Sequence, residues 1–201
     1  CRHHHAQRGR AGDEGLIAGA RLVSAPTARY PSGVNPFLKA IDALNKSGAR
    51  YVIVGGLAGY LLGTRRITVD LDLILDLRPQ ESLRAIDALL AAGFQSRLPV
   101  DPHLFAEPVH RTSWVRDKNM IVFSFFHPEL SGFIVDLFVD EPIPFESLYA
   151  RSCELDFDGS KARVCSIDDL IDLKLKADRE KDRMDVVMLR ELKSMRGRSQ
   201  Q

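Results

Sequence analysis

Apolar residues recur along the chain with the spacings of a protein that mixes helices and strands. Between Asn35 and Ser47 they fall three or four positions apart behind a proline that suits a first helical turn, which predicts a helix. The apolar run 51–54 then predicts a short buried strand, and the double glycine after it leads into an apolar helix. A strand, two glycines and a helix form the first informative unit of the chain.

The segment 69–76 alternates apolar and acidic positions, which predicts a strand with one carboxylate-bearing face. One face carries Val69, Leu71, Leu73 and Leu75, and the other carries Asp70, Asp72, Ile74 and Asp76. A helix is predicted next over 79–92, because it opens with a proline, places Leu83, Ile86, Leu89 and Leu90 at helical spacing and meets Gly93.

The second half of the chain alternates loops, strands and helices. The stretch 97–111 holds three prolines with little periodicity and is predicted to be a loop, whereas 120–126 and 133–139 are apolar enough for buried strands. The segment 153–165 predicts a hairpin that turns at Asp158 and Gly159. Ser166 can cap a helix after it, and two helices with a break near 179–183 are expected, because one uninterrupted helix would be unusually long.

Composition narrows the class of protein. The chain has 201 residues, 45% hydrophobic and 27% charged, the balance of one globular domain with or without a small helical appendage. A formal net charge of +1 gives no overall field that would demand a nucleic acid or an anionic membrane as partner. Three cysteines without metal-binding spacing predict reduced thiols, and no apolar run approaches the roughly 18 residues of a membrane span. A soluble, cytoplasmic protein is expected.

Three aspartates carry the candidate chemistry. Asp70 and Asp72 project from one face of a strand, so their carboxylates can converge, and convergent like charges need a cation. Asp136 lies in the middle of an apolar strand, where an ionised carboxylate is costly to bury without a partner or metal. Mg²⁺ prefers hard oxygen ligands and commonly takes a few carboxylates plus phosphate oxygens. A two-metal phosphoryl-transfer site follows, with Asp136 also as candidate base.

Gly55 and Gly56 stand where a triphosphate could approach the backbone, between a strand and a helix. A double glycine by itself is often only a tight turn, and a lone Asp-x-Asp more often marks an exposed strand face. The combination is more specific than either part.

Residues 51–76 resemble the nucleotidyltransferase superfamily, the polymerase-beta-like group, and most closely its toxin-like, abortive-infection and minimal members. The resemblance consists of the strand, the double glycine, the helix and a G-x-x-R-x-T-x-D-x-D motif, matched by Gly63, Arg66, Thr68, Asp70 and Asp72. The serine that many members carry after the first glycine is replaced by Gly56.

The resemblance implies roles for individual residues. Asp70, Asp72 and Asp136 would be catalytic and bind Mg²⁺ or Mn²⁺; Gly55, Gly56, Arg66 and Lys174 would bind the nucleotide. The C-terminal stretch resembles the helical segment of the toxin-like branch, where Lys174 could reach a phosphate or merely extend to solvent. Asp182 and Asp185 could orient Lys174 or Arg66, or belong to a solvated surface.

The implied fold is α/β (α+β), a small mixed sheet flanked by helices. Residues 1–33 would form a flexible N-terminal extension, 34–165 the nucleotidyltransferase core, and 166–201 a C-terminal helical segment packed on the core. The expected reaction transfers a nucleoside monophosphate from a nucleoside triphosphate such as ATP to an acceptor hydroxyl, releasing pyrophosphate.

The acceptor stays open between tRNA, another RNA, a protein and a small molecule. Its recognition is expected from 97–118, because loops around a fixed scaffold commonly supply specificity. A toxin–antitoxin role with an antitoxin partner is one option, and no membrane association is expected. Two alternatives remain: a catalytically silent nucleotide-binding regulator or antitoxin partner, and a metal-dependent phosphohydrolase.

Overall fold

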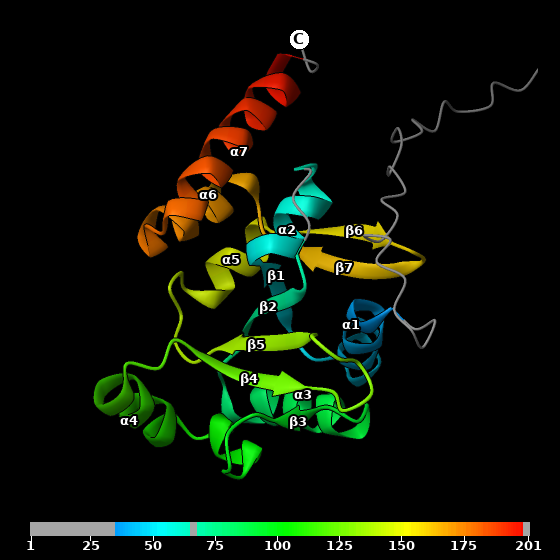
Figure 1. Ribbon diagram of the computed structural model, residues 1–201, viewed down its shortest axis with the longest axis vertical. Coiled ribbons are helices and arrows are strands. Elements are labelled where there is room, and N and C mark those ends of the chain that lie inside the picture. Colours follow the sequence, from blue (N-terminus) through cyan, green and yellow to red (C-terminus); the bar gives the residue numbers. More distant parts are fainter. Residues whose placement is uncertain (1–34, 65–67, 199–201) are drawn as a thin grey trace, which may run out of the picture.

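The computed structural model describes residues 35–64 and 68–198 (Figure 1). Within these ranges seven strands form one mixed sheet, in the order β3-β4-β5-β2-β1-β7-β6. The strands are β1 (Tyr51–Val54), β2 (Asp70–Leu75), β3 (Gln95–Ser96), β4 (Val122–Phe126), β5 (Ile134–Phe138), β6 (Cys153–Phe157) and β7 (Ser160–Val164). The helices are α1 (Pro36–Ser47), α2 (Gly55–Leu62), α3 (Pro79–Ala91), η1 (Pro102–Ala106), α4 (Pro108–Lys118), α5 (Phe145–Arg151), α6 (Ile167–Ala177) and α7 (Glu180–Arg198). The predicted α/β class is confirmed.

The predicted helix, strand, double glycine and helix at the start of the core are confirmed. The side chain of Asn35 caps α1 by accepting a hydrogen bond from the backbone N–H of Phe37, and Gly48 ends the helix in a left-handed conformation. β1 is buried along its whole length, and α2 begins directly at Gly55. The expected N-terminal extension 1–33 and Arg66 lie outside the described residues.

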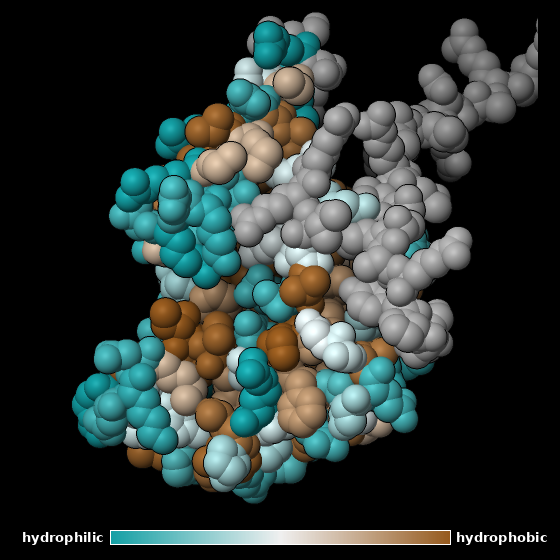
Figure 2. Space-filling view, in the orientation of Figure 1, coloured by the Kyte–Doolittle hydropathy of each residue, from teal (hydrophilic) through white to brown (hydrophobic). Residues whose placement is uncertain are grey.

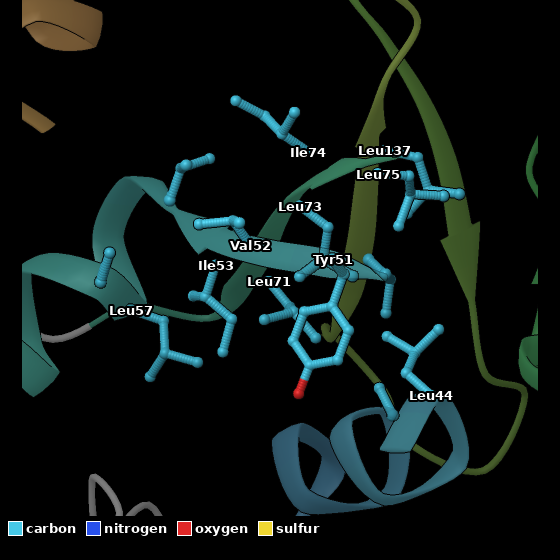
Figure 3. Close-up of a cluster of buried hydrophobic side chains, with 14 of the residues drawn as sticks. Leu44, Tyr51, Val52, Ile53, Leu57, Leu71, Leu73, Ile74, Leu75 and Leu137 are labelled. Carbon is cyan, nitrogen blue, oxygen red and sulfur yellow. The ribbon is translucent and has the colours of Figure 1, made fainter. Parts of the chain in front are cut away.

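β2 and β1 hold the centre of the sheet. β2 pairs antiparallel with β1 and parallel with β5. In Figure 3, Tyr51, Ile53 and Leu71 lie on the side of the sheet that faces α1, together with Leu44 of that helix. Burying one such side chain contributes about 1.5–3 kcal/mol, so this side anchors the strands whose other side carries the aspartates.

The predicted loop over 97–111 is wrong, because η1 and α4 occupy most of that stretch. Each helix has a proline in its first turn, where the missing N–H costs nothing, so these prolines start helices. The buried face of α4 is carried by Arg111 and Trp114, which gives no apolar periodicity. The Arg111 guanidinium donates to the carbonyl oxygens of Phe105, at 2.6 Å, and Leu77, at 3.0 Å.

The predicted hairpin between Cys153 and Cys165 is confirmed as β6 and β7. Its two turn residues, Asp158 and Gly159, both have positive φ, at 51° and 87°, as a tight hairpin turn requires. Cys153 is exposed, Cys165 is buried, and both are free thiols, as expected. α5, which precedes the hairpin, was not predicted from the sequence.

Two helices follow the hairpin, as predicted, with Ser166 as the first cap. The break falls at Asp178, in a left-handed conformation, and Arg179, at the start of the predicted interval. α6 packs against both α2 and α7, and α7 extends away from the sheet (Figure 1). In the part of the chain that the structure describes, no helix combines the length and apolarity needed to cross a membrane.

The inner face of α3 differs from the predicted one at a single leucine. Leu89 is fully buried, whereas Leu83 keeps 37% of its surface exposed. Ser82 and Ala85 are buried instead of Leu83. The side of α3 that faces the core is therefore rotated away from Leu83 relative to the predicted face. The hydroxyl of Ser82 donates to the carbonyl oxygen of Asp76 at 3.1 Å, so this buried polar group is satisfied.

The two leucines give a matched test of the core. Leu89→Ala leaves a cavity and should lower the free energy of unfolding by about 2–5 kcal/mol. Leu83→Ala, the same substitution on the same helix, should lower it by less than about 1 kcal/mol. Urea unfolding followed by circular dichroism measures both, and equal losses would contradict the observed position of α3.

Candidate active site

The three predicted aspartates meet on one side of the sheet. Asp70 and Asp72 lie two positions apart on β2, and Asp136 of β5 stands directly opposite Asp72 in the parallel register. Neighbouring strands lie about 4.8 Å apart, so side chains paired in this way are immediate neighbours. All three line one cavity of ≈ 510 Å³. The prediction that they come together is confirmed by this placement, while their binding of metal stays a prediction.

The cavity has walls of different character. Gly55, Gly56 and Thr68 line it beside the aspartates, and Lys174 and Arg179 line it from the helical side. A third wall is apolar and comes from Ile121, Val122, Phe138 and Pro142. Figure 2 shows hydrophobic side chains gathered over the ends of β4 and β5, between α4 and the junction of α6 with α7. No residue of 97–118 lines this cavity, so the segment expected to recognise the acceptor lies outside its wall.

Burial and mutual repulsion raise the pKa of the central carboxylates. Burial, followed by the negative charge of Asp136, raises the pKa of Asp72 to about 6, with a smaller opposing effect of the Arg179 charge. Burial and the charge of Asp70 raise the pKa of Asp136 as well. The hydroxyl of Ser124 on β4 opposes this shift by donating to Asp136 Oδ1 at 2.5 Å. The site therefore concentrates negative charge that is only partly compensated.

The donor set fits a divalent cation that the substrate helps to hold. In residues 35–64 and 68–198, no group of three or more His, Cys, Asp or Glu side chains is arranged to bind a metal ion by itself. Mg²⁺, however, is usually bound by one or two carboxylates together with water and substrate phosphates, without a full protein cage. Asp72 and Asp136 would supply adjacent hard oxygen ligands, because the register of β2 and β5 sets them opposite each other.

The double glycine is required by close packing against β2. A Cβ at Gly55 would lie 1.9 Å from Oδ2 of Asp72, and one at Gly56 would lie 2.5 Å from the hydroxyl oxygen of Thr68. The backbone N–H of Gly56 donates to the Asp72 carboxylate and lowers its pKa. The start of α2 thus sits directly over the carboxylates, and phosphate binding by these glycines stays a prediction.

Lys174 lines the cavity, but its ammonium group is engaged within the protein. Its Nζ donates to Asp185 Oδ2 at 2.6 Å and to Asp182 Oδ1 at 3.4 Å, and its side chain is 8% exposed. The alternative that Lys174 extends to solvent is therefore wrong. Asp182 and Asp185 are buried partners of Lys174, so the solvated-surface interpretation of these two acids is also wrong.

Two residues of the site escaped the sequence analysis. Ser124 is the polar member of an apolar strand, and its position opposite Asp136 follows only from the pairing of β4 with β5. Arg179 falls in the break between α6 and α7 and reaches the cavity because the chain turns there. The isolated serine in a run of phenylalanines was a usable signal, whereas nothing in the sequence distinguishes Arg179 from its charged neighbours.

Similarity to a solved structure identifies the fold that carries this site. No family model and no curated protein sequence matches the chain. Among solved structures, the lincosamide antibiotic adenylyltransferase LnuA with lincomycin bound superposes with a TM-score of 0.52 at 14% identity, covering 78% of this chain and 95% of that one. This chain has the nucleotidyltransferase fold.

Two further solved structures show lower similarity to this chain. ANT(2″)-Ia in complex with adenylyl-2″-tobramycin gives a TM-score of 0.49 at 15% identity over 82% of this chain and 95% of that one. An antigenic nucleotidyltransferase-like protein from Paracoccidioides brasiliensis gives 0.48 at 18% identity over 76% and 73%. The superposition on LnuA confirms the nucleotidyltransferase fold predicted from the motif in 51–76, while the roles of single residues rest on the geometry of this chain.

The contact between Gly55 and Asp72 can be tested against a second glycine. Gly55 and Gly48 have similar positive φ values, 66° and 71°, but a Cβ at Gly48 meets nothing within 4 Å. Gly48→Ala should therefore cost only the backbone strain, about 1–2 kcal/mol of unfolding free energy. Gly55→Ala adds an overlap with the carboxylate and should cost at least about 1 kcal/mol more in urea unfolding. Equal losses would contradict the close approach of α2 to β2.

The raised pKa of Asp72 predicts how stability depends on pH. A carboxyl whose pKa rises from 3.8 to about 6 on folding binds its proton more tightly in the folded chain than in the unfolded chain. Its contribution to the free energy of unfolding is therefore complete at low pH and is lost as the pH rises through about 6. Asp72→Asn imitates the protonated form.

In the presence of a chelator, Asp72→Asn should stabilise the nucleotidyltransferase fold at pH 8 by about 1 kcal/mol or more, and most of this gain should disappear at about pH 4. Urea unfolding at the two pH values measures it. Asp172→Asn, which changes an exposed carboxylate on α6, should show no such difference. Destabilisation by Asp72→Asn at pH 8 would show that the carboxylate is compensated within the protein.

Proposed function

We propose that this protein is a metal-dependent nucleotidyltransferase, which transfers a nucleoside monophosphate from a nucleoside triphosphate to an acceptor hydroxyl and releases pyrophosphate. The observation that carries the proposal is the register of β2 and β5, which sets Asp136 opposite Asp72 with Asp70 on the same face. These three carboxylates line a cavity beside the glycine-led start of α2, in a nucleotidyltransferase fold. Clustered carboxylates beside free space for a phosphate chain suit phosphoryl transfer.

Asp70, Asp72 and Asp136 would hold the catalytic Mg²⁺ or Mn²⁺ ions. The ions, when bound, supply positive charge to the α-phosphate and to the leaving pyrophosphate. The raised pKa values of Asp72 and Asp136 support this assignment, because both shifts reflect negative charge and burial that a cation would relieve.

Gly55 and Gly56 would let the phosphate chain approach the backbone at the start of α2, where the helix dipole favours an anion. Asp136 would accept the proton of the acceptor hydroxyl as the new oxygen–phosphorus bond forms and the bond to pyrophosphate breaks. The hydrogen bond from Ser124 to Asp136 Oδ1 fixes the orientation of this carboxylate.

The helical segment 166–201 would pack on the core 34–165 and line one wall of the cavity with Lys174 and Arg179. Arg66 would add a phosphate contact from the strand motif. The apolar wall and the lincomycin named for LnuA support a small-molecule acceptor, and RNA and protein hydroxyls stay as alternative acceptors. Cytoplasmic location, ATP as the nucleotide and a toxin–antitoxin role remain predictions from the sequence.

The test supplies each α-labelled nucleoside triphosphate with Mg²⁺ and three classes of acceptor: RNA, protein and hydroxyl-bearing antibiotics. Label should appear in one acceptor class. Asp136→Asn and Asp72→Asn should lower its rate of appearance at least about 100-fold, because each removes charge stabilisation from the reacting centre. Asp172→Asn should leave the rate unchanged.

The other outcomes separate the two rival functions. Release of free nucleoside monophosphate with no labelled acceptor would favour a metal-dependent phosphohydrolase. Nucleotide binding without transfer or release, across metals and acceptors, would favour the catalytically silent regulator or antitoxin partner. Failure to bind any nucleoside triphosphate would overturn the proposal.

A further inference from the structure

Four charged side chains gather where α6 gives way to α7. Lys174 lies on α6, Arg179 in the break, and Asp182 and Asp185 on α7. The side chains of Lys174, Asp182 and Asp185 are 8%, 1% and 7% exposed, whereas that of Arg179 is 60% exposed. Three of the four charged side chains are therefore buried, and Arg179 is the exposed one at the cavity that Lys174 and Asp182 also line.

Lys174 is held in place by the two buried carboxylates. Its contacts with Asp185 at 2.6 Å and Asp182 at 3.4 Å use two of its three N–H donors. A direct contact with a phosphate would draw the ammonium away from carboxylates that have almost no access to water. Leaving a buried carboxylate without its partner is strongly unfavourable, so the observed arrangement favours a Lys174 that stays where it is.

Asp182 connects Lys174 to Arg179. Its Oδ2 accepts from Arg179 Nε at 2.6 Å, and its Oδ1 accepts from Arg179 Nη2 at 3.4 Å and from Lys174 Nζ. This arrangement engages one edge of the guanidinium and leaves the Nη1 donors and one Nη2 donor outside the contact with Asp182. A guanidinium fixed along one edge can present the other edge to an anion with little loss of conformational freedom.

Arg179 is also placed to meet the substrate. It lines the cavity that contains Asp72 and Gly55, and its charge acts on the Asp72 carboxylate. A triphosphate that lies along the carboxylates would have Arg179 on the wall of the same cavity. Guanidinium groups bind phosphate oxygens through paired N–H donors, which an exposed, edge-anchored arginine can supply.

We infer that Arg179 binds the phosphate chain of the nucleoside triphosphate, and that Asp182, held in turn by Lys174, positions Arg179 for this contact. The inference rests on the proposed function and assigns Lys174 an indirect role in it. Arg179 is then the binding residue, and Lys174 and Asp182 are positioning residues.

The test measures binding of α,β-methylene-ATP with Mg²⁺ to the full chain by isothermal titration calorimetry. Arg179→Met should weaken binding about 10-fold or more, since it removes charged hydrogen bonds to phosphate. Arg179→Lys should recover only part of the loss, because lysine lacks the planar fork. Arg183→Met is the matched control, since Arg183 is 71% exposed, lies on α7 four residues after Arg179 and pairs with Asp178. It should bind like the wild type.

Double substitutions separate the indirect role of Lys174 from a direct one. Lys174→Met and the milder Asp182→Asn should each weaken binding in the wild-type background. Each should add less than about 2-fold when Arg179 is already Met, because both act through Arg179. Circular dichroism and urea unfolding identify variants that fail to fold, and Asp182→Asn then carries the comparison.

Each remaining outcome overturns a defined part. A further loss of 10-fold or more on adding Lys174→Met to Arg179→Met would show that Lys174 contacts the nucleotide by itself. Wild-type affinity in Arg179→Met would overturn the role of Arg179 and leave the proposed function standing. Failure of the wild-type chain to bind α,β-methylene-ATP, other nucleoside triphosphates or Mg²⁺ complexes of them would overturn both.

Discussion

Two carboxylates that face each other across neighbouring strands govern the organisation of this molecule. The parallel register of β2 and β5 places Asp72 beside Asp136, and burial strengthens their repulsion. Three surrounding groups partly compensate this negative charge. Ser124 donates its hydroxyl hydrogen to Asp136, Gly56 donates its backbone N–H to Asp72, and Arg179 adds a positive charge near Asp72. The pKa of Asp72 nevertheless stays raised, so the fold tolerates an unfavourable arrangement at its centre.

Burial of the apolar side of the same strands offsets the repulsion between the carboxylates. Leu71 and Leu73 alternate with the aspartates and are fully buried, as is Ile53, which faces Leu73 on β1. β2 lies between two strands, so a shift of its register would expose the leucines and bury the aspartates among apolar groups. The hydrophobic pattern that stabilises the sheet therefore also fixes the direction of the carboxylates, and rigid strands hold them more accurately than loops would.

Local sequence patterns predicted much of the fold, and they failed where one residue type is compatible with two different local structures. Alternation around Asp70 predicted β2 and its acidic face, and the Asp158–Gly159 pair predicted the hairpin turn. The three prolines in 97–111 indicated a loop, yet Pro102 and Pro108 open helices, because proline suits a first helical turn as well as a loop. The buried face of α4 was not recognisable in the sequence because it carries Arg111. The burial of this arginine depends on carbonyl groups of other segments.

The sequence by itself determined most of the helices and strands outside η1, α4 and α5, the double glycine and the identity of the three candidate aspartates, because periodicity and residue chemistry are local properties. Only the tertiary structure decided that Asp136 lies opposite Asp72, that Ser124 binds Asp136 and that Lys174 faces two buried carboxylates. These facts depend on strand order and on where α7 turns back beside α6. Residues far apart in sequence become neighbours only when burial of apolar surface fixes which segments meet.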